Sequence, residues 1–180
     1  MILGALLSCL LVGIPVWRMN MKLQENRYDA LILSAAAENG CDPSLIKAMV
    51  WRESKFDPNA RGKDGEIGLM QVMPVVAAEW ATAHSHKKFD PHRLIDPGIN
   101  LRIGTWHLSR ALQRWAHASD PVSLALAQYN AGRSNVLKWV DAGSMTDGEY
   151  FVTRIQFPST QGYVRDILKQ HRFYRNRGEF

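Results

Sequence analysis

Apolar side chains recur along this chain at helical spacing, and runs of alternating β-branched residues, which mark strands, are nearly absent. The broadest apolar face falls in residues 97–115 and comprises Ile99, Leu101, Ile103, Trp106, Leu108, Leu112 and Trp115. A helix that is apolar over so wide an arc packs against neighbours on several sides. We therefore expect this helix at the centre of the core.

Helix starts are marked by aspartate–proline pairs, which include five of the eight prolines. These pairs are Asp42-Pro43, Asp57-Pro58, Asp90-Pro91, Asp96-Pro97 and Asp120-Pro121. Aspartate accepts hydrogen bonds from the free amides of a first helical turn, and proline tolerates the first helical position because its missing N–H has no partner there anyway. The expected helices are 27–39, 43–53, 74–84, 97–115, 121–129, 134–142 and 162–175. The predicted fold class is mainly α, with one helical domain over residues 27–180.

Residues 1–17 contain no charged side chain and are just long enough for a short membrane span or the apolar core of a signal peptide. Arg18 and Lys22 follow this segment instead of preceding it, and the positive-inside rule read literally would place the rest of the chain in the cytoplasm. We interpret residues 1–17 as an export signal or membrane anchor and residues 18–26 as a linker. This interpretation places the domain in the periplasm or cell envelope, with the membrane as a candidate partner.

The composition is that of an ordinary globular protein, with 46% hydrophobic and 22% charged residues and a formal net charge of +5. A basic surface favours anionic partners such as nucleic acid, anionic lipid or acidic wall polymer. No phosphate-binding glycine loop or nucleic-acid-reading motif is present, so we expect no nucleic-acid partner. His84 and His86 lack accompanying ligands, so we expect neither a metal nor a cofactor. We expect a monomer.

One carboxylate continues an apolar stripe. Ile46, Met49 and Val50 follow helical spacing, and the next position on that stripe is Glu53. Burial at the end of a core-facing stripe would raise the pKa of this carboxyl, which is what a general acid needs near neutral pH. Periodicity alone leaves a second interpretation equally open, in which Glu53 lies in solvent or pairs with a neighbouring basic residue.

Four blocks of sequence favour the first interpretation, in which Glu53 is a general acid. They are Glu53-Ser54 with the residues that follow, Gly68-Leu69-Met70-Gln71, Tyr129-Asn130-Ala131-Gly132, and residues 155–164. In order and spacing they resemble the motifs of the soluble lytic transglycosylase (SLT) family, and the resemblance covers roughly residues 28–175. It implies a lysozyme-like helical domain with a catalytic cleft.

The resemblance also implies a reaction. Such enzymes cleave the β-1,4 bond between N-acetylmuramic acid and N-acetylglucosamine in peptidoglycan strands, and they leave a 1,6-anhydro end. By this analogy Glu53 is the single acid/base catalyst. Gln71, Met73, Tyr129 and Asn130 match positions that line the cleft. Gln71 would hydrogen-bond the sugar and Tyr129 would hold the carboxylate or the sugar.

A second carboxylate would change the mechanism, because two-carboxylate glycosidases place their acids about 5–9.5 Å apart. Asp64 and Glu66, in the loop before Gly68, are the neighbours that could reach Glu53, although a solvated loop is the commoner outcome. Glu66 is therefore a candidate auxiliary residue, and Ser54 is expected to brace the local structure. Gly62 stands where many relatives carry serine.

The residues near the C-terminal block also depart from the family pattern. Thr153, Arg154 and Ser159 stand where acidic residues are common in relatives. Three rival functions remain open: a hydrolytic lysozyme on the same fold, a wall-binding or secretion-accessory module of low activity, and, last, a basic nucleic-acid binder.

Overall fold

The computed structural model describes residues 24–85, 88–178 and 180. Its elements are α2 (Asp29–Asn39), α3 (Pro43–Ser54), α4 (Pro74–Ala83), the 3-10 helix η1 (Pro91–Ile95), α5 (Pro97–Arg114), α6 (Pro121–Ala131), α7 (Arg133–Trp139), α8 (Ala142–Thr146), α9 (Gly148–Arg154) and α10 (Pro158–Asn176). Within these residues, β structure is limited to the isolated bridges Arg61–Ile67 and Ile67–Val72. The prediction of a mainly helical domain is confirmed.

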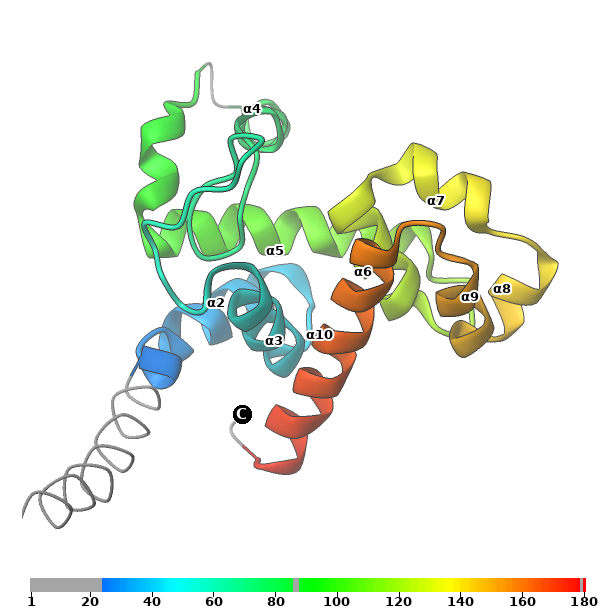
Figure 1. Ribbon diagram of the computed structural model, residues 1–180. Coiled ribbons are helices and arrows are strands. Elements are labelled where there is room, and N and C mark those ends of the chain that lie inside the picture. The colour runs from blue at the N-terminus through cyan, green and yellow to red at the C-terminus, as the bar shows by residue number, and fades with distance from the viewer. Residues whose placement is uncertain (1–23, 86–87, 179) are drawn as a thin grey trace, which may run out of the picture.

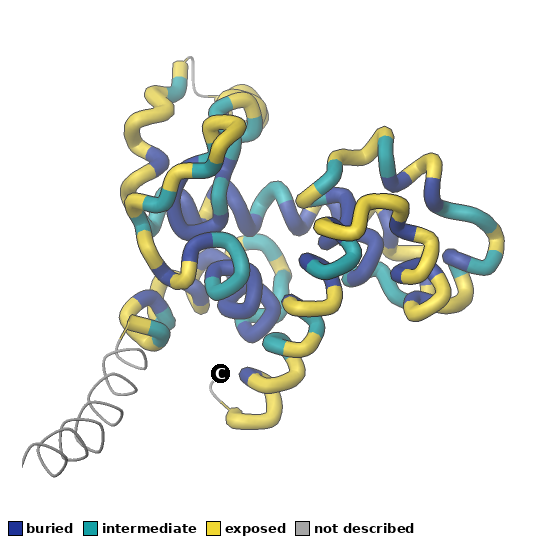
Figure 2. Tube along the Cα trace, viewed as in Figure 1, coloured by how far each residue is buried: buried dark blue, intermediate teal, exposed yellow. Residues whose placement is uncertain are grey.

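Helix α5 runs through the middle of the domain, with α4 toward one end and α7, α8 and α9 toward the other (Figure 1). Helices α2 and α6 pack against α5, and α10 packs against α3 and α6. Buried positions are concentrated in α3, α5 and α6 (Figure 2). The wide apolar face of α5 therefore has the central place expected from the sequence.

Aspartate caps begin three of the longer helices. Asp42, Asp96 and Asp120 accept backbone N–H hydrogen bonds at the starts of α3, α5 and α6, and Asp90 does the same for η1. The expectation fails at Asp57, which accepts the Asn59 N–H in a turn with no helix after it. The capping chemistry is the same in that turn, but no amphipathic segment follows to extend it.

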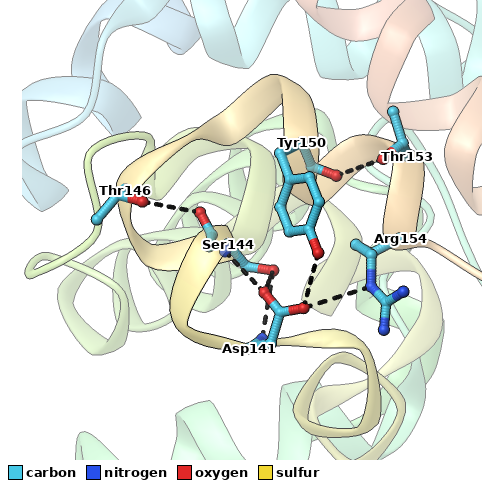
Figure 3. A network of polar contacts seen from close by, with 7 residues as sticks. Asp141, Ser144, Thr146, Tyr150, Thr153 and Arg154 are labelled. Carbon is cyan, nitrogen blue, oxygen red and sulfur yellow. Dashed lines mark hydrogen bonds and ion pairs between the residues drawn. The ribbon is translucent and has the colours of Figure 1, made fainter.

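The stretch between α7 and α10 contains two short helices that the sequence pattern does not reveal. Asp141 organises it: one carboxylate oxygen accepts the Ser144 N–H at 2.9 Å, and the other accepts the Tyr150 hydroxyl at 3.0 Å and lies 3.6 Å from Arg154 (Figure 3). Thr153 donates to the Tyr150 carbonyl. Helices of five and seven residues are too short to show a helical period, so α8 and α9 were missed.

The N-terminal segment at residues 1–17 lies outside the described residues. No helix among those that are described is long and apolar enough to cross a membrane. Residues 24–26 are helical and contact the domain, since Lys47 donates to Asn26 at 3.1 Å and Tyr174 donates to Glu25.

Candidate active site

Glu53 occupies the last turn of α3. The stripe that leads to it is fully buried, with Ile46, Met49 and Val50 each at 0% exposure. The helix stops abruptly after Ser54, because Lys55 and Phe56 adopt positive φ angles of 53° and 66°. Glu53 is therefore held on a rigid helix, at the point where the chain leaves it.

The Glu53 carboxyl is desolvated. Burial raises its pKa to about 7, and the Glu66 charge adds to the rise, while the hydrogen bond from Tyr163 and the charge of Arg52 oppose it. The Tyr163 hydroxyl donates to Glu53 Oε1 at 2.6 Å. Glu53 is half-buried and its carboxyl is desolvated, so of the two interpretations open at the sequence level the structure favours the one with a raised pKa.

Tyr163 is a neighbour that the sequence reasoning did not select. It lies on α10, is itself buried, and its ring is covered by Arg52, whose guanidinium carbon lies 5.5 Å from the ring centroid. Arg52 is in turn paired with Asp166 at 3.1 Å. The residue lay inside the fourth block of the family resemblance, and that was the only sequence indication of it.

The loop after α3 is fastened to the helix end. The buried Ser54 hydroxyl donates to the carbonyls of Val50 at 3.1 Å and Leu69 at 2.9 Å. These two bonds tie the Gly-Leu-Met-Gln segment to the last turn of α3, so Ser54 braces the structure as the sequence suggested.

Gln71 is fixed by the same loop. Its φ angle is 47°, and its side-chain Nε2 donates to the carbonyls of Ala60 at 3.2 Å and Gly68 at 3.0 Å. With the amide nitrogen engaged in this way, Oε1 faces the backbone at Gly62. The amide oxygen is the group that Gln71 can offer to a ligand.

Asn100, on α5, is hydrogen-bonded to the loop that carries Gln71. It is fully buried, accepts the Met70 N–H at 2.8 Å, and donates to the carbonyls of Ile67 and Leu94 at 2.8 Å each. All these groups belong to the peptide backbone, so one side chain satisfies three of them. Asn100 was not anticipated from the sequence.

Tyr129 approaches the site from α6. Its hydroxyl donates to the Met70 carbonyl at 2.9 Å, so the hydrogen bond to Glu53 comes from Tyr163 instead. Burial raises the pKa of Tyr129 well above its ordinary value, and the nearby Glu53 charge adds to the rise. Both tyrosines therefore stay neutral hydroxyl donors.

Glu66 folds back over Gly62. A Cβ atom added at Gly62 would lie 2.1 Å from Glu66 Oε2 and 2.9 Å from Gln71 Oε1, so the carboxylate fills the space that a side chain at position 62 would need. The Asp64 N–H holds Glu66 Oε2 at 3.0 Å, while the Asp64 side chain is exposed. Of the two loop acids, Glu66 is the one whose charge acts on Glu53.

Comparison with known proteins agrees with this arrangement. Residues 30–152 match the model of the transglycosylase SLT domain family. The chain belongs to this family.

Relatives of this SLT domain carry consistent names. The soluble lytic murein transglycosylase of Salmonella typhimurium is 32% identical over 151 residues, which is 83% of this chain and 23% of the relative. The membrane-bound lytic murein transglycosylase C of Glaesserella parasuis is 29% identical over 183 residues, covering 92% of this chain and 50% of the relative. The SLT domain thus spans about a quarter of the soluble relative and half of the membrane-bound one.

Solved structures share the fold. The 70-kDa soluble lytic transglycosylase of Escherichia coli superposes with a TM-score of 0.75 at 30% identity, covering 83% of this chain and 24% of that one. An inactive glutamate-to-glutamine mutant of the Pseudomonas aeruginosa lytic transglycosylase Slt gives a TM-score of 0.74 at 29% identity, covering 83% and 24%. The lysozyme-like helical fold is therefore confirmed.

The remaining predicted site residues, Asn130 and Met73, are not fully buried. Asn130 is exposed, and its Oδ1 accepts the Thr160 hydroxyl at 2.7 Å, which ties the end of α6 to the start of α10. Met73 is half-buried and precedes the first residue of α4, whereas Met70 is fully buried in the core. Met70 therefore contributes to packing, and Met73 keeps a partly open surface.

Proposed function

We propose that this SLT domain is a peptidoglycan lytic transglycosylase with Glu53 as its acid/base catalyst. The observation that carries the proposal is the desolvated Glu53 carboxyl, held by Tyr163 at 2.6 Å with a pKa of about 7. A carboxyl with a pKa near the ambient pH can give up a proton and take one back within one turnover. The names of the relatives support the same reaction class.

The reaction needs only one carboxyl. Protonated Glu53 gives its proton to the glycosidic oxygen between N-acetylmuramic acid and N-acetylglucosamine as that bond breaks. The resulting Glu53 carboxylate then takes the proton of the muramic acid C6 hydroxyl while that oxygen attacks C1. A 1,6-anhydro ring forms, no water is consumed, and Glu53 ends the cycle protonated.

Other residues of the site would position the strand. Gln71 presents its amide oxygen toward Gly62, where it can accept a hydrogen bond from a sugar hydroxyl or an acetamido N–H. The hydroxyl of Tyr163 holds the carboxyl, and Tyr129 lies near enough for the Glu53 charge to raise its pKa, so two neutral tyrosines would border the reacting group. Met73 and Asn130 remain candidate contacts at the edge of the site.

The products of digestion test the reaction. Purified peptidoglycan is treated with the protein and the released muropeptides are weighed. We expect anhydro-muramic ends, each one water lighter than the corresponding reducing ends. Reducing ends would instead indicate a hydrolytic lysozyme, the rival favoured by the position of Glu66 over Gly62. Intact strands that merely bind the protein would indicate a wall-binding module.

The role of Glu53 is tested by Glu53→Gln, which keeps the shape of the side chain and an oxygen for Tyr163. We expect activity to fall by about 10²–10⁴-fold, the usual contribution of general acid–base catalysis. The matched control is Glu149→Gln on the exposed side of α9, which should leave activity unchanged. Wall lysis that survives Glu53→Gln would remove the catalytic assignment.

The proposal extends to location. A wall-cleaving activity requires access to peptidoglycan, so we place the protein in the periplasm or cell envelope, with residues 1–17 as export signal or anchor. Fractionation of cells that produce the full chain would test this. Recovery in the cytoplasmic fraction would contradict it.

A further inference from the structure

The second half of α10 presents basic side chains to solvent, on the side opposite to its buried residues. Arg165, Lys169 and Arg172 are spaced so that they align along one stripe of the helix, and all three are exposed. Phe173 lies beside them and is 45% exposed. We call these four residues the α10 basic face. Figure 2 shows this half of the helix largely in the colour of exposed residues.

The charges of the α10 basic face are hardly used inside the domain. Arg165 donates to Gln161 at 3.1 Å. Within the described part of the chain, Lys169 and Arg172 take part in neither an ion pair nor a side-chain hydrogen bond. Residues 165–180 carry five basic and two acidic side chains. Basic charge that the domain itself does not neutralise favours an anionic partner outside it.

The described chain starts beside this half of α10. Tyr174 donates to Glu25, and the Lys47 ammonium bonds Asn26 and lies 5.3 Å from the ring centroid of Phe180. Both ends of the described chain therefore lie on the same side of the domain, below α3 in Figure 1.

The apolar segment at residues 1–17 is tied closely to that side. Trp17 and Gln24 are seven residues apart in sequence, so even a fully extended chain separates them by at most about 25 Å. With residues 1–17 as a membrane anchor, this side of the domain is the one held near the bilayer.

Two exposed aromatic rings distinguish lipid from other anionic partners. Phe173 and Phe180 are 45% and 38% exposed, next to the basic side chains. Helices that lie on membranes combine basic residues, which meet the headgroup phosphates, with aromatic rings, which enter the apolar boundary beneath them. A soluble anionic polymer would meet the charges but offers no apolar layer for the rings. The combination favours a lipid surface.

We propose that the α10 basic face, together with Phe180, rests on the anionic headgroups of the membrane in which residues 1–17 are anchored. The proposal relies on the anchor role of residues 1–17 and not on the reaction at Glu53. Tyr163, which bonds Glu53, precedes Arg175 by twelve residues, or about 18 Å along the helix. Docking by the second half of α10 would thus hold the catalytic site away from the lipid, where a glycan strand can reach it.

Contact with lipid can be read from the phenylalanine rings. The full chain, labelled with para-fluorophenylalanine, is reconstituted in lipid nanodiscs that contain a headgroup-spin-labelled lipid, and its fluorine NMR spectrum is recorded. In nanodiscs of phosphatidylcholine with phosphatidylglycerol, we expect broadened signals from Phe173 and Phe180. Phe157, 43% exposed just before α10 begins, is the internal control and should stay sharp. Equal broadening of all three rings, no broadening, or the same result in phosphatidylcholine alone would overturn the proposal.

The double variant Lys169→Gln with Arg172→Gln tests the charges. Each basic side chain near an anionic membrane surface favours attachment about fivefold, so the ratio of docked to undocked domain should fall by up to about 30-fold. The control, Arg133→Gln with Lys138→Gln on the exposed side of α7, removes the same charge elsewhere and should keep the broadening of Phe173. Unchanged broadening in the first variant, or equal loss in both, would contradict the proposal.

A soluble anionic wall polymer is tested on the same labelled protein. If it perturbs Phe173 and Phe180 without lipid as strongly as the anionic nanodiscs do, the polymer and not the membrane is the partner of this face.

The docking proposal and the catalytic proposal fail in distinguishable ways. Docking is read from the rings and needs no turnover, so it can be measured in Glu53→Gln as well. If the rings contact lipid but no strand is cut, only the catalytic proposal falls. If strands are cut to anhydro ends while the rings stay sharp, only the docking proposal falls.

Discussion

Four influences set the pKa of the Glu53 carboxyl. Burial raises the pKa and Glu66 adds to the rise, whereas the hydrogen bond from Tyr163 and the charge of Arg52 lower it. Each polar neighbour can be altered with little change of shape. The position of the alkaline limb of the activity profile then reports the pKa of Glu53, because the proposed mechanism begins with its protonated form.

Tyr163→Phe removes the hydroxyl that donates to Glu53 at 2.6 Å and keeps the ring beneath Arg52. The charged form of Glu53 loses that bond, so its pKa rises and the alkaline limb should move up by about one pH unit. The pH dependence of kcat/KM checks this. The control is Tyr150→Phe, which removes a similar tyrosine bond to Asp141 away from the site. An unmoved limb in Tyr163→Phe would mean that the bond does not act on the catalytic proton.

Glu66→Gln should act in the opposite direction. It removes a negative charge that raises the pKa of Glu53, so the alkaline limb moves to lower pH by a few tenths of a unit, roughly as expected for a partly screened charge. Asp64→Asn, an exposed carboxylate in the same loop, is the control and should have no effect. If Glu66→Gln instead abolished activity in an enzyme that makes reducing ends, Glu66 would be a catalyst that orients water.

The sequence identified a site residue only where its position follows from residues close to it in the chain. The stripe through Ile46 and Val50 pointed to Glu53 because helical period alone determines which face of α3 it shares. Tyr163 and Asn100 could not be found in that way. Their contacts depend on how α10 and α5 pack against segments far away in the chain, and periodicity carries no information about that.

Among the elements, α5 and the loop 60–73 depend on each other most. Gly104 on α5 lies so close to Met70 that an added Cβ would be 2.6 Å from its sulfur, and Asn100 binds the Met70 N–H one turn earlier. The loop that carries Gln71 therefore takes its shape from the side of a helix. Loss of this support should affect stability and activity together.

Asn100→Ala tests that dependence. It leaves the Met70 N–H and the Leu94 carbonyl buried without the Asn100 partner, while the Ile67 carbonyl keeps its bond from the Val72 N–H at 2.9 Å. Each orphaned group costs about 1–3 kcal/mol, so we expect a loss of about 3 kcal/mol or more in the free energy of unfolding, measured in urea. Asn135→Ala, which removes one bond from α7 to Ala131 at the end of α6, should cost only about 1 kcal/mol. Equal costs would mean that the loop holds its shape without Asn100.

Helix starts were predictable where a cap is followed by a long segment. Asp96 and Asp120 begin α5 and α6 as expected, but α10 begins at Pro158 and not at residue 162. Phe157 precedes that proline and provides no side-chain cap. The start of α10 thus depends on Pro158 and on Thr160 bonding Asn130, and the second contact exists only once α6 is in place.

At the scale of the whole molecule, both ends of the described chain meet at α3. Lys47 is fully buried there; it pairs with Asp29 at 2.9 Å and bonds Asn26 at 3.1 Å. Its ammonium also lies 5.2 Å and 5.3 Å from the ring centroids of Tyr174 and Phe180. A buried ammonium is costly by itself, so these contacts from both ends are what make it tolerable.

Lys47→Met tests how far the ends depend on this one group. Methionine fills much of the space but leaves Asp29 without its partner, and breaking a buried pair in this way costs about 3–5 kcal/mol. Asp29 is still 29% exposed, so we expect about 3 kcal/mol, the lower end of that range. Thermal and urea unfolding measure the loss. Adding Asp29→Asn removes the unpaired charge and should recover part of the stability, since the remaining contacts to Tyr174 and Phe180 are apolar. If Lys47→Met were as stable as the parent, apolar packing alone would hold the two ends of the described chain on α3. Lys47 would then contribute nothing to stability.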